Sequence, residues 1–169
     1  GVYFNGSSPL TVTNSVFSNN IYSATQGTGL WVEGASQVSV TGSVFTANPS
    51  YAVFFSNLSS LTTFTFSGNT ASGNGNNIAA LYGTLGASIT LTPNPTLPYA
   101  LMGYLTVPAG VTLTLQPGVV FKSGGGSNRI FHVAGTFLAQ GTSGSPVYLT
   151  SEKDDTIVGD TNGNANEDW

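Results

Sequence analysis

The sequence predicts an all-β fold, a right-handed parallel β-helix in which short coils stack as a solenoid. The first observation is an internal repeat: residues 1–17 align without a gap on residues 29–45, an offset of 28 residues with eight identical positions. Such a period is typical of stacked repeats, because one unit cannot bury its own apolar face alone. The second observation is strand-like alternation inside each repeat, as in Leu10-Thr11-Val12-Thr13.

The other segments agree with this architecture. Clusters of Gly, Asn, Ser and Pro separate the alternating runs and favour turns. No segment combines helical apolar spacing with caps, which excludes helical repeats. A third, looser copy ends at residues 66–69 and predicts two columns of stacked side chains. The internal column is Phe17, Phe45 and Phe66, and the column at a turn is Asn20, Asn48 and Asn69.

The composition indicates a secreted or cell-surface setting of bacterial type. Of the 169 residues only 6% are charged and none is Cys, while Ser, Thr, Asn and Gly are abundant. Soluble domains usually carry about 25% charged residues. No apolar run approaches the roughly 20 residues that a membrane-spanning helix needs, so we expect no membrane span. Three basic residues and a pI near 4.4 disfavour nucleic-acid binding.

The chain divides into three regions by composition. Residues 1–85 read as Asn- and Ser-rich coils, residues 86–150 as coils of a second type, and residues 151–169 as an acidic loop. Six of the seven acidic residues lie in residues 152–169. The third region is therefore a site or a linker.

The acidic loop predicts a calcium site. Oxygen-bearing side chains alternate from Asp160 to Asn166 in a Gly-containing stretch, and Ca²⁺ takes six to eight closely spaced oxygen ligands. The candidate ligands are Asp154, Asp155, Asp160, Asn162, Asn164 and Asp168. The alternative is a solvated acidic turn in which Asn and Gly serve only the backbone.

Residues 105–123 (LTVPAGVTLTLQPGVVFKS) and 133–169 resemble the right-handed β-helix repeat regions of large bacterial surface and secreted proteins. In those proteins a "VPAGVTLTIxPGVVVK" segment, a "GTLxAQGT" turn, a "PVxFTSxKDD" strand and a "GDTNGDG" loop run into "DWGGI". The resemblance implies an architecture and no particular activity. The acidic loop departs from the pattern at Asn164, where Asp is usual.

The resemblance also implies assembly. The family pattern runs on from Asp-Trp into Gly-Gly-Ile, and the two ends of this chain, joined tail to head, read Asp-Trp-Gly-Val-Tyr. We therefore expect a processed or excised unit of a tandem array or filament, which meets other copies of itself head-to-tail. No amphipathic cap is evident at either end, and uncapped strand edges template further pairing. The expected interface residues are Gly1, Val2, Tyr3, Phe4 and Trp169.

The sequence offers little for catalysis. A polysaccharide lyase or hydrolase needs paired carboxylates, or calcium beside a basic residue, in a groove. Lys122 and Arg129 flank a Gly-rich loop with no acid nearby in sequence, and we expect them to anchor a loop. His132 lies in an alternating strand. We therefore predict that the protein is not an enzyme.

Aromatic residues leave a second function open. Tyr3, Trp31, Tyr51, Phe54 and Phe55 form a sugar-stacking strip if they face outward, and fill the core or cover turns if they do not. A surface polysaccharide is the partner that such a strip implies. We predict a structural, self-associating extracellular unit, with a surface adhesin or carbohydrate-binding module as the alternative.

Overall fold

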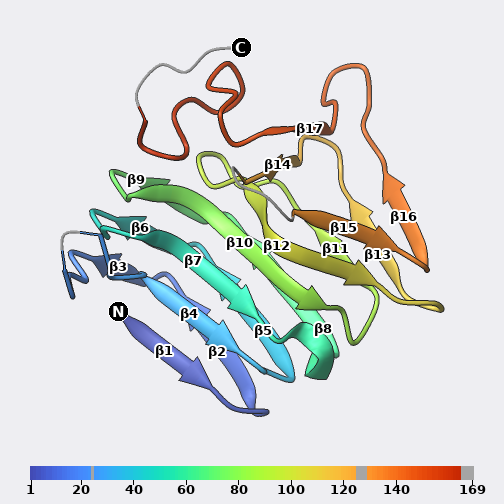
Figure 1. Cartoon of the computed structure of the whole chain (residues 1–169), viewed down its shortest axis with the longest axis horizontal. Helices are drawn as coiled ribbons and strands as arrows, with labels where there is room; N and C mark the ends of the chain where they lie inside the picture. The colour runs from blue at the N-terminus through green and yellow to red at the C-terminus, as the bar shows by residue number, and fades with distance from the viewer. Residues whose placement is uncertain (24, 125–128, 165–169) are drawn as a thin grey trace.

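The structure is a computed structural model that describes residues 1–23, 25–124 and 129–164. It is a right-handed parallel β-helix in which the chain winds coil upon coil (Figure 1). Every pair of named strands within these residues is parallel. The helical content within the described residues is one 3₁₀ turn, η1 (Leu58–Ser60). The predicted fold class is confirmed.

One long sheet, here called sheet A, runs the length of the solenoid. Its strands follow the order β1-β4-β7-β10-β12-β14-β17, and β15 pairs with the second half of β12. The strands are β1 (Val2–Asn5), β4 (Leu30–Glu33), β7 (Tyr51–Ser56), β10 (Asn76–Thr84), β12 (Tyr99–Val107), β14 (Val120–Ser123), β15 (Ile130–Val133) and β17 (Tyr148–Ser151).

Three shorter sheets complete the coils. Sheet B holds β2 (Pro9–Thr13), β5 (Gln37–Thr41) and β8 (Thr63–Ser67), and sheet C holds β3 (Val16–Ser18), β6 (Val44–Thr46) and β9 (Thr70–Ser72). Sheet D holds β11 (Ile89–Leu91), β13 (Thr112–Leu115) and β16 (Thr136–Ala139). The first three coils are three-sided. Among the described residues no strand of sheet C follows β9, so later coils have two sides.

The repeat predicted the first two coils in register. Phe17 pairs with Phe45, and their rings stack with centroids 4.9 Å apart. Phe66 is not in this column, which corrects the prediction: it pairs with Val40 in sheet B, and Ala71 lies beside Phe45. The third coil is offset by 26 residues in sheet C, as the pairing of Phe45 with Ala71 requires.

The predicted Asn column also needs correction. Asn20, Asn48 and Asn74 stack at the turn after sheet C, where Asn48 Oδ1 accepts from Asn20 and Asn74 Oδ1 accepts from Asn48. Asn69 belongs to a second ladder, at the turn after sheet B, and its Oδ1 accepts from the backbone N–H of Ser43 at 2.9 Å. The turns after sheets B and C resemble each other, because in both a residue with a left-handed backbone conformation comes before the ladder residue. Gly68 before Asn69 is an example.

These ladders satisfy backbone groups that the turns bury. Asn48 and Asn69 are fully buried, and their Nδ2 groups donate to the carbonyl oxygens of Phe17 and Val40. A buried polar group without a partner costs about 1–3 kcal/mol. Each ladder side chain therefore fixes the position of one coil relative to the neighbouring coil.

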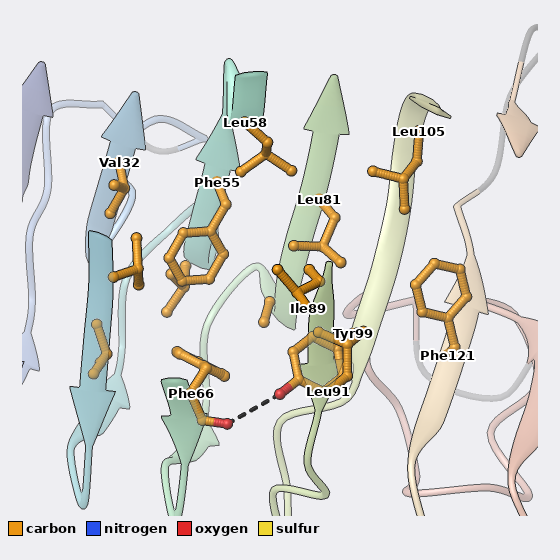
Figure 2. Close-up of a cluster of buried hydrophobic side chains, with 14 of the residues drawn as sticks. Val32, Phe55, Leu58, Phe66, Leu81, Ile89, Leu91, Tyr99, Leu105 and Phe121 are labelled. Carbon is orange, nitrogen blue, oxygen red and sulfur yellow. Dashed lines mark hydrogen bonds between the residues drawn. The ribbon is translucent and has the colours of Figure 1, made fainter. Parts of the chain in front are cut away.

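The core is a continuous apolar column inside the coils. Figure 2 shows side chains from successive strands, including Val32, Phe55, Leu81, Leu105 and Phe121, pointing into the same interior. The Tyr99 hydroxyl lies 3.0 Å from the Phe66 carbonyl oxygen and 2.9 Å from that of Thr92. Burial raises the pKa of Tyr99, so the phenol stays protonated and bonded inside the core.

Replacement of Phe45 by Ala tests this packing. Phe45 is fully buried, so Phe45→Ala is expected to lower the free energy of unfolding by about 3–5 kcal/mol. Phe17→Ala removes the same ring from the half-buried first coil and serves as the matched control. Urea unfolding followed by circular dichroism measures both variants. Equal losses would contradict the burial difference between the two coils.

Candidate functional site

The outer face of sheet A carries a row of aromatic side chains. Tyr3, Trp31 and Phe54 occupy paired positions on β1, β4 and β7. The Tyr3 and Trp31 ring centroids are 5.4 Å apart, and those of Trp31 and Phe54 are 5.2 Å apart. In-register stacking of coils thus converts one outward position per coil into a continuous aromatic row.

Tyr82 and Tyr104 lie farther along sheet A, at a bulge between β10 and β12. The register between β10 and β12 shifts after Leu81, and this shift brings the rings of Tyr82 and Tyr104 to a centroid distance of 4.6 Å. Gly103 has a positive φ of 116°, and a Cβ there would lie 2.8 Å from the Tyr82 ring. A glycine is therefore required for this contact.

A groove of about 520 Å³ lies between these two aromatic groups. Trp31 and Phe54 line it from β4 and β7, and Tyr82 and Tyr104 from β10 and β12. The polar lining residues are Glu33, Ser56, Asn57, Ser59 and Thr84. The Trp31 indole N–H donates to Ser56 Oγ at 3.0 Å, which fixes the ring.

Sequence reasoning identified part of this face. Trp31 and Phe54 line the groove, and Tyr3 and Tyr51 lie beside them, but Phe55 is fully buried in the core. Phe55 fills the core, which is the alternative that the sequence left open: it directly follows Phe54 in β7 and points to the opposite, inner face. Tyr82 and Tyr104 were missed, although each stands next to a glycine, Gly83 or Gly103, and an aromatic–glycine pair in a strand is a signal of a bulge.

The acidic loop folds back over sheet A around Lys122. Lys122 is fully buried, and its Nζ donates to the Asp154 carbonyl oxygen at 2.8 Å and to Thr161 Oγ1 at 3.0 Å. The backbone N–H of Asn77 donates to the Thr161 carbonyl oxygen at 2.8 Å, which ties the loop to β10. Lys122 is thus a loop anchor, and the loop it holds is the acidic one.

Burial and the neighbouring carboxylates have opposite effects on the pKa of Lys122. Burial lowers the pKa of Lys122, and the nearby carboxylates of Asp154, Asp155 and Asp160 act in the opposite direction. Hydrogen bonds from Thr150 and Thr156 lower the pKa of Asp154. The ammonium group therefore supplies positive charge at the centre of the loop.

Five of the six predicted calcium ligands lie in the described part of the acidic loop. Asp154 and Asp160 accept hydrogen bonds from their own turns, Asp160 from the backbone of Asn162 and Gly163. Asn164 is exposed, and Asp168 lies outside the described residues. Within the part of the chain that the structure describes, no three acidic or histidine side chains form a metal cluster.

Asp155 is the feature of the loop that fits a cation. Both of its carboxylate oxygens are buried and have no hydrogen-bond partner among the described residues. A buried carboxylate without a hydrogen-bond partner carries a large desolvation cost, which the nearby Lys122 ammonium group offsets in part and a bound cation would offset further. Asp155 would hold such an ion with nearby oxygen atoms of the loop.

Four of the five predicted assembly residues, at positions 1–4, lie in the first coil. Gly1, Val2 and Tyr3 are exposed and line a hollow of about 610 Å³, while Phe4 is half-buried against the core. Glu33 accepts a hydrogen bond from the Tyr3 hydroxyl, and this bond raises the pKa of Tyr3. Trp169 lies outside the described residues.

The remaining basic groups are dispersed. His132 is exposed on β15 and pairs in register with Thr106, and Lys153 is half-buried in the acidic loop. Arg129 is half-buried at the start of β15. None of the helical segments within the described residues is long and apolar enough to cross a membrane.

The comparison with known families agrees with this geometry. The family model described as "Right handed beta helix region" matches residues 1–94, more than half of the chain. The protein therefore belongs to the right-handed β-helix family. No curated protein and no solved structure matches it.

Replacement of Lys122 by Met tests its role as the anchor of the acidic loop. The change leaves the Asp154 carbonyl and the Thr161 hydroxyl without their donor, so we expect a loss of about 1–3 kcal/mol in stability. Amide hydrogen exchange should accelerate across residues 152–163. Lys153→Met alters the net charge equally at a less buried position and should do less. Unchanged exchange in Lys122→Met would contradict the anchor.

Calcium binding stays a prediction that thermal melting tests. If Asp155 holds the ion, added Ca²⁺ should raise the melting temperature. A free Ca²⁺ concentration of 100 times the dissociation constant should raise the free energy of unfolding by about 2.7 kcal/mol. A chelator should reverse the gain, and Asp155→Asn should abolish it. Thr156→Ser, in the same loop, is the control. Identical melts with Ca²⁺ and with chelator would leave the solvated acidic turn.

Proposed function

We propose that this β-helix is a structural, self-associating unit at the cell surface or in the extracellular space. Its copies stack head-to-tail and extend one solenoid. The observation that supports the proposal is the parallel, in-register pairing of the first coil with the second, a contact that a coil of another copy would repeat on the other side. The proposal assigns the chain no catalytic reaction.

The core side chains of the first coil are less covered than their partners in the second. Four inward residues of the first coil are only partly buried, whereas the register partner of each is at most 2% exposed. The pairs are Phe4 with Val32, Leu10 with Val38, Val12 with Val40, and Phe17 with Phe45. Another coil placed on this end would remove that apolar surface from water.

The strand edges of the first coil are also open. β1, β2 and β3 are the edge strands of sheets A, B and C. Along β2 the backbone N–H groups point alternately toward β5 and away from it. The N–H of Asn14, just after the strand, donates to the Thr41 carbonyl oxygen and so points toward β5. The N–H groups of Thr11 and Thr13 therefore point away from β5, to the open side. Such an edge is a template for pairing with another strand.

The last described coil also carries edge strands. β16 and β17 are the last strands of sheets D and A, and Leu149 on β17 is 57% exposed. Contact between two different ends is heterologous, and when successive units share one solenoid axis it does not close and generates fibres. Sparse charge supports the proposed location, because neutral, hydroxyl-rich surfaces suit a secreted repeat protein.

A carbohydrate-binding or adhesin role is the second candidate. The observation that favours it is the aromatic groove on sheet A, whose lining strands β4, β7, β10 and β12 lie between the edge strands β1 and β17. A side groove stays available when coils stack end to end. The two functions are therefore compatible.

Thr11→Pro tests the stacking proposal. The proline removes an N–H that faces the open side and no bond to β5, so we expect an unchanged fold and loss of association. Sedimentation velocity and negative-stain imaging over a concentration series should show fibres for the unmodified chain and monomers for the variant.

Ser39→Pro is the matched control, because Ser39 pairs with Thr11 and its N–H lies between β2 and β5. It should lower the melting temperature, which Thr11→Pro should not. A chain that remains monomeric at high concentration would refute the stacking proposal. Fibres formed equally by Thr11→Pro would refute the assignment of the open edge.

A further inference from the structure

We infer that the groove on the outer face of sheet A binds a neutral oligosaccharide chain laid along the solenoid axis. The inference rests on the second candidate function and names its ligand class. It depends on four aromatic side chains, Trp31, Phe54, Tyr82 and Tyr104, and on the charge of the residues between them.

The aromatic side chains are spaced along the axis. They come from β4, β7, β10 and β12, which lie side by side in sheet A (Figure 1). Adjacent strands are about 4.8 Å apart, so the four strands span about 14 Å. A linear chain of several pyranose rings has this extended shape, whereas a single small cation needs rings that converge on one point.

The rings present faces that a sugar can reach. Trp31 is 41% exposed and Tyr104 is 43% exposed, a high value for large aromatic groups. The bond from Trp31 to Ser56 and the close approach of Tyr82 to Gly103 hold the rings in place before any ligand arrives. Rings that are already ordered lose little side-chain entropy on binding.

The polar groups between the rings select for a neutral ligand with hydroxyl groups. Glu33, Asn57 and Ser59 supply a carboxylate, an amide and a hydroxyl to the groove. Among the described residues, none of those that line it is Lys, Arg or His. The Glu33 carboxylate would repel an acidic sugar, and the chain carries a net charge of −4.

The test measures binding of defined hexasaccharides to the full chain by calorimetry. The neutral probes are cellohexaose, maltohexaose, xylohexaose and mannohexaose, and the acidic probe is hexagalacturonate. We expect at least one neutral probe to bind and hexagalacturonate not to bind. Trp31→Ala and Tyr104→Ala should each weaken binding by about tenfold or more, since exposed aromatic anchors dominate such contacts.

Tyr148→Ala is the matched control, because Tyr148 is 39% exposed on β17 and does not line the groove. It should bind as the unmodified chain does. Circular dichroism of each variant shows whether the fold is intact, and Trp31→Phe with Tyr104→Phe offers a milder pair that retains the rings. This pair should retain most of the affinity.

Several results would overturn the inference. Binding of hexagalacturonate alone would refute a neutral ligand and leave a carbohydrate-binding function in place. Binding of none of the five probes would refute both. Neutral binding that Trp31→Ala and Tyr104→Ala leave unchanged would place the sugar elsewhere. Self-association that Trp31→Ala abolishes would show that the groove receives a second copy of the chain.

Discussion

Hydrogen-bonded stacking of side chains at the turns is the constraint on which the rest of the molecule depends. Parallel coils must meet in register, since a slip of one residue exchanges the inner and outer faces of a strand. The buried amides of Asn48 and Asn69 prevent such a slip, because each bonds to backbone groups of a neighbouring coil. The apolar core can then remain a simple column of Leu, Val and Phe side chains, which alone would specify the register poorly.

The same register produces the outer surface. A position that faces outward on one coil faces outward on the next, so Tyr3, Trp31 and Phe54 form a row without any further device. The bulge between β10 and β12 interrupts this regularity and brings Tyr82 against Tyr104. Regular stacking thus builds one side of the groove and a local irregularity builds the other.

The sequence was sufficient for the architecture and for the first two coils, where an ungapped offset states the register directly. It misplaced the third coil. The turns after sheets B and C both place a residue with a left-handed backbone before the ladder side chain, so the local sequence does not distinguish one turn from the other. It identified Trp31 but not Tyr104, whose partner depends on a bulge between β10 and β12, a pair of strands for which the sequence shows no repeat. The role of Lys122 as anchor of the acidic loop was hidden for the same reason: the contact spans 32 residues.

For the proposed fibre, the change from three-sided to two-sided coils has a mechanical consequence. Sheet C ends at β9 within the described residues, whereas sheet A continues to β17. In a fibre of stacked units, sheet C would begin afresh in every copy, so fewer backbone bonds would cross a junction than cross the first coils of a unit. Load along the axis would then separate the fibre at its junctions, and the fragments would be whole multiples of one unit.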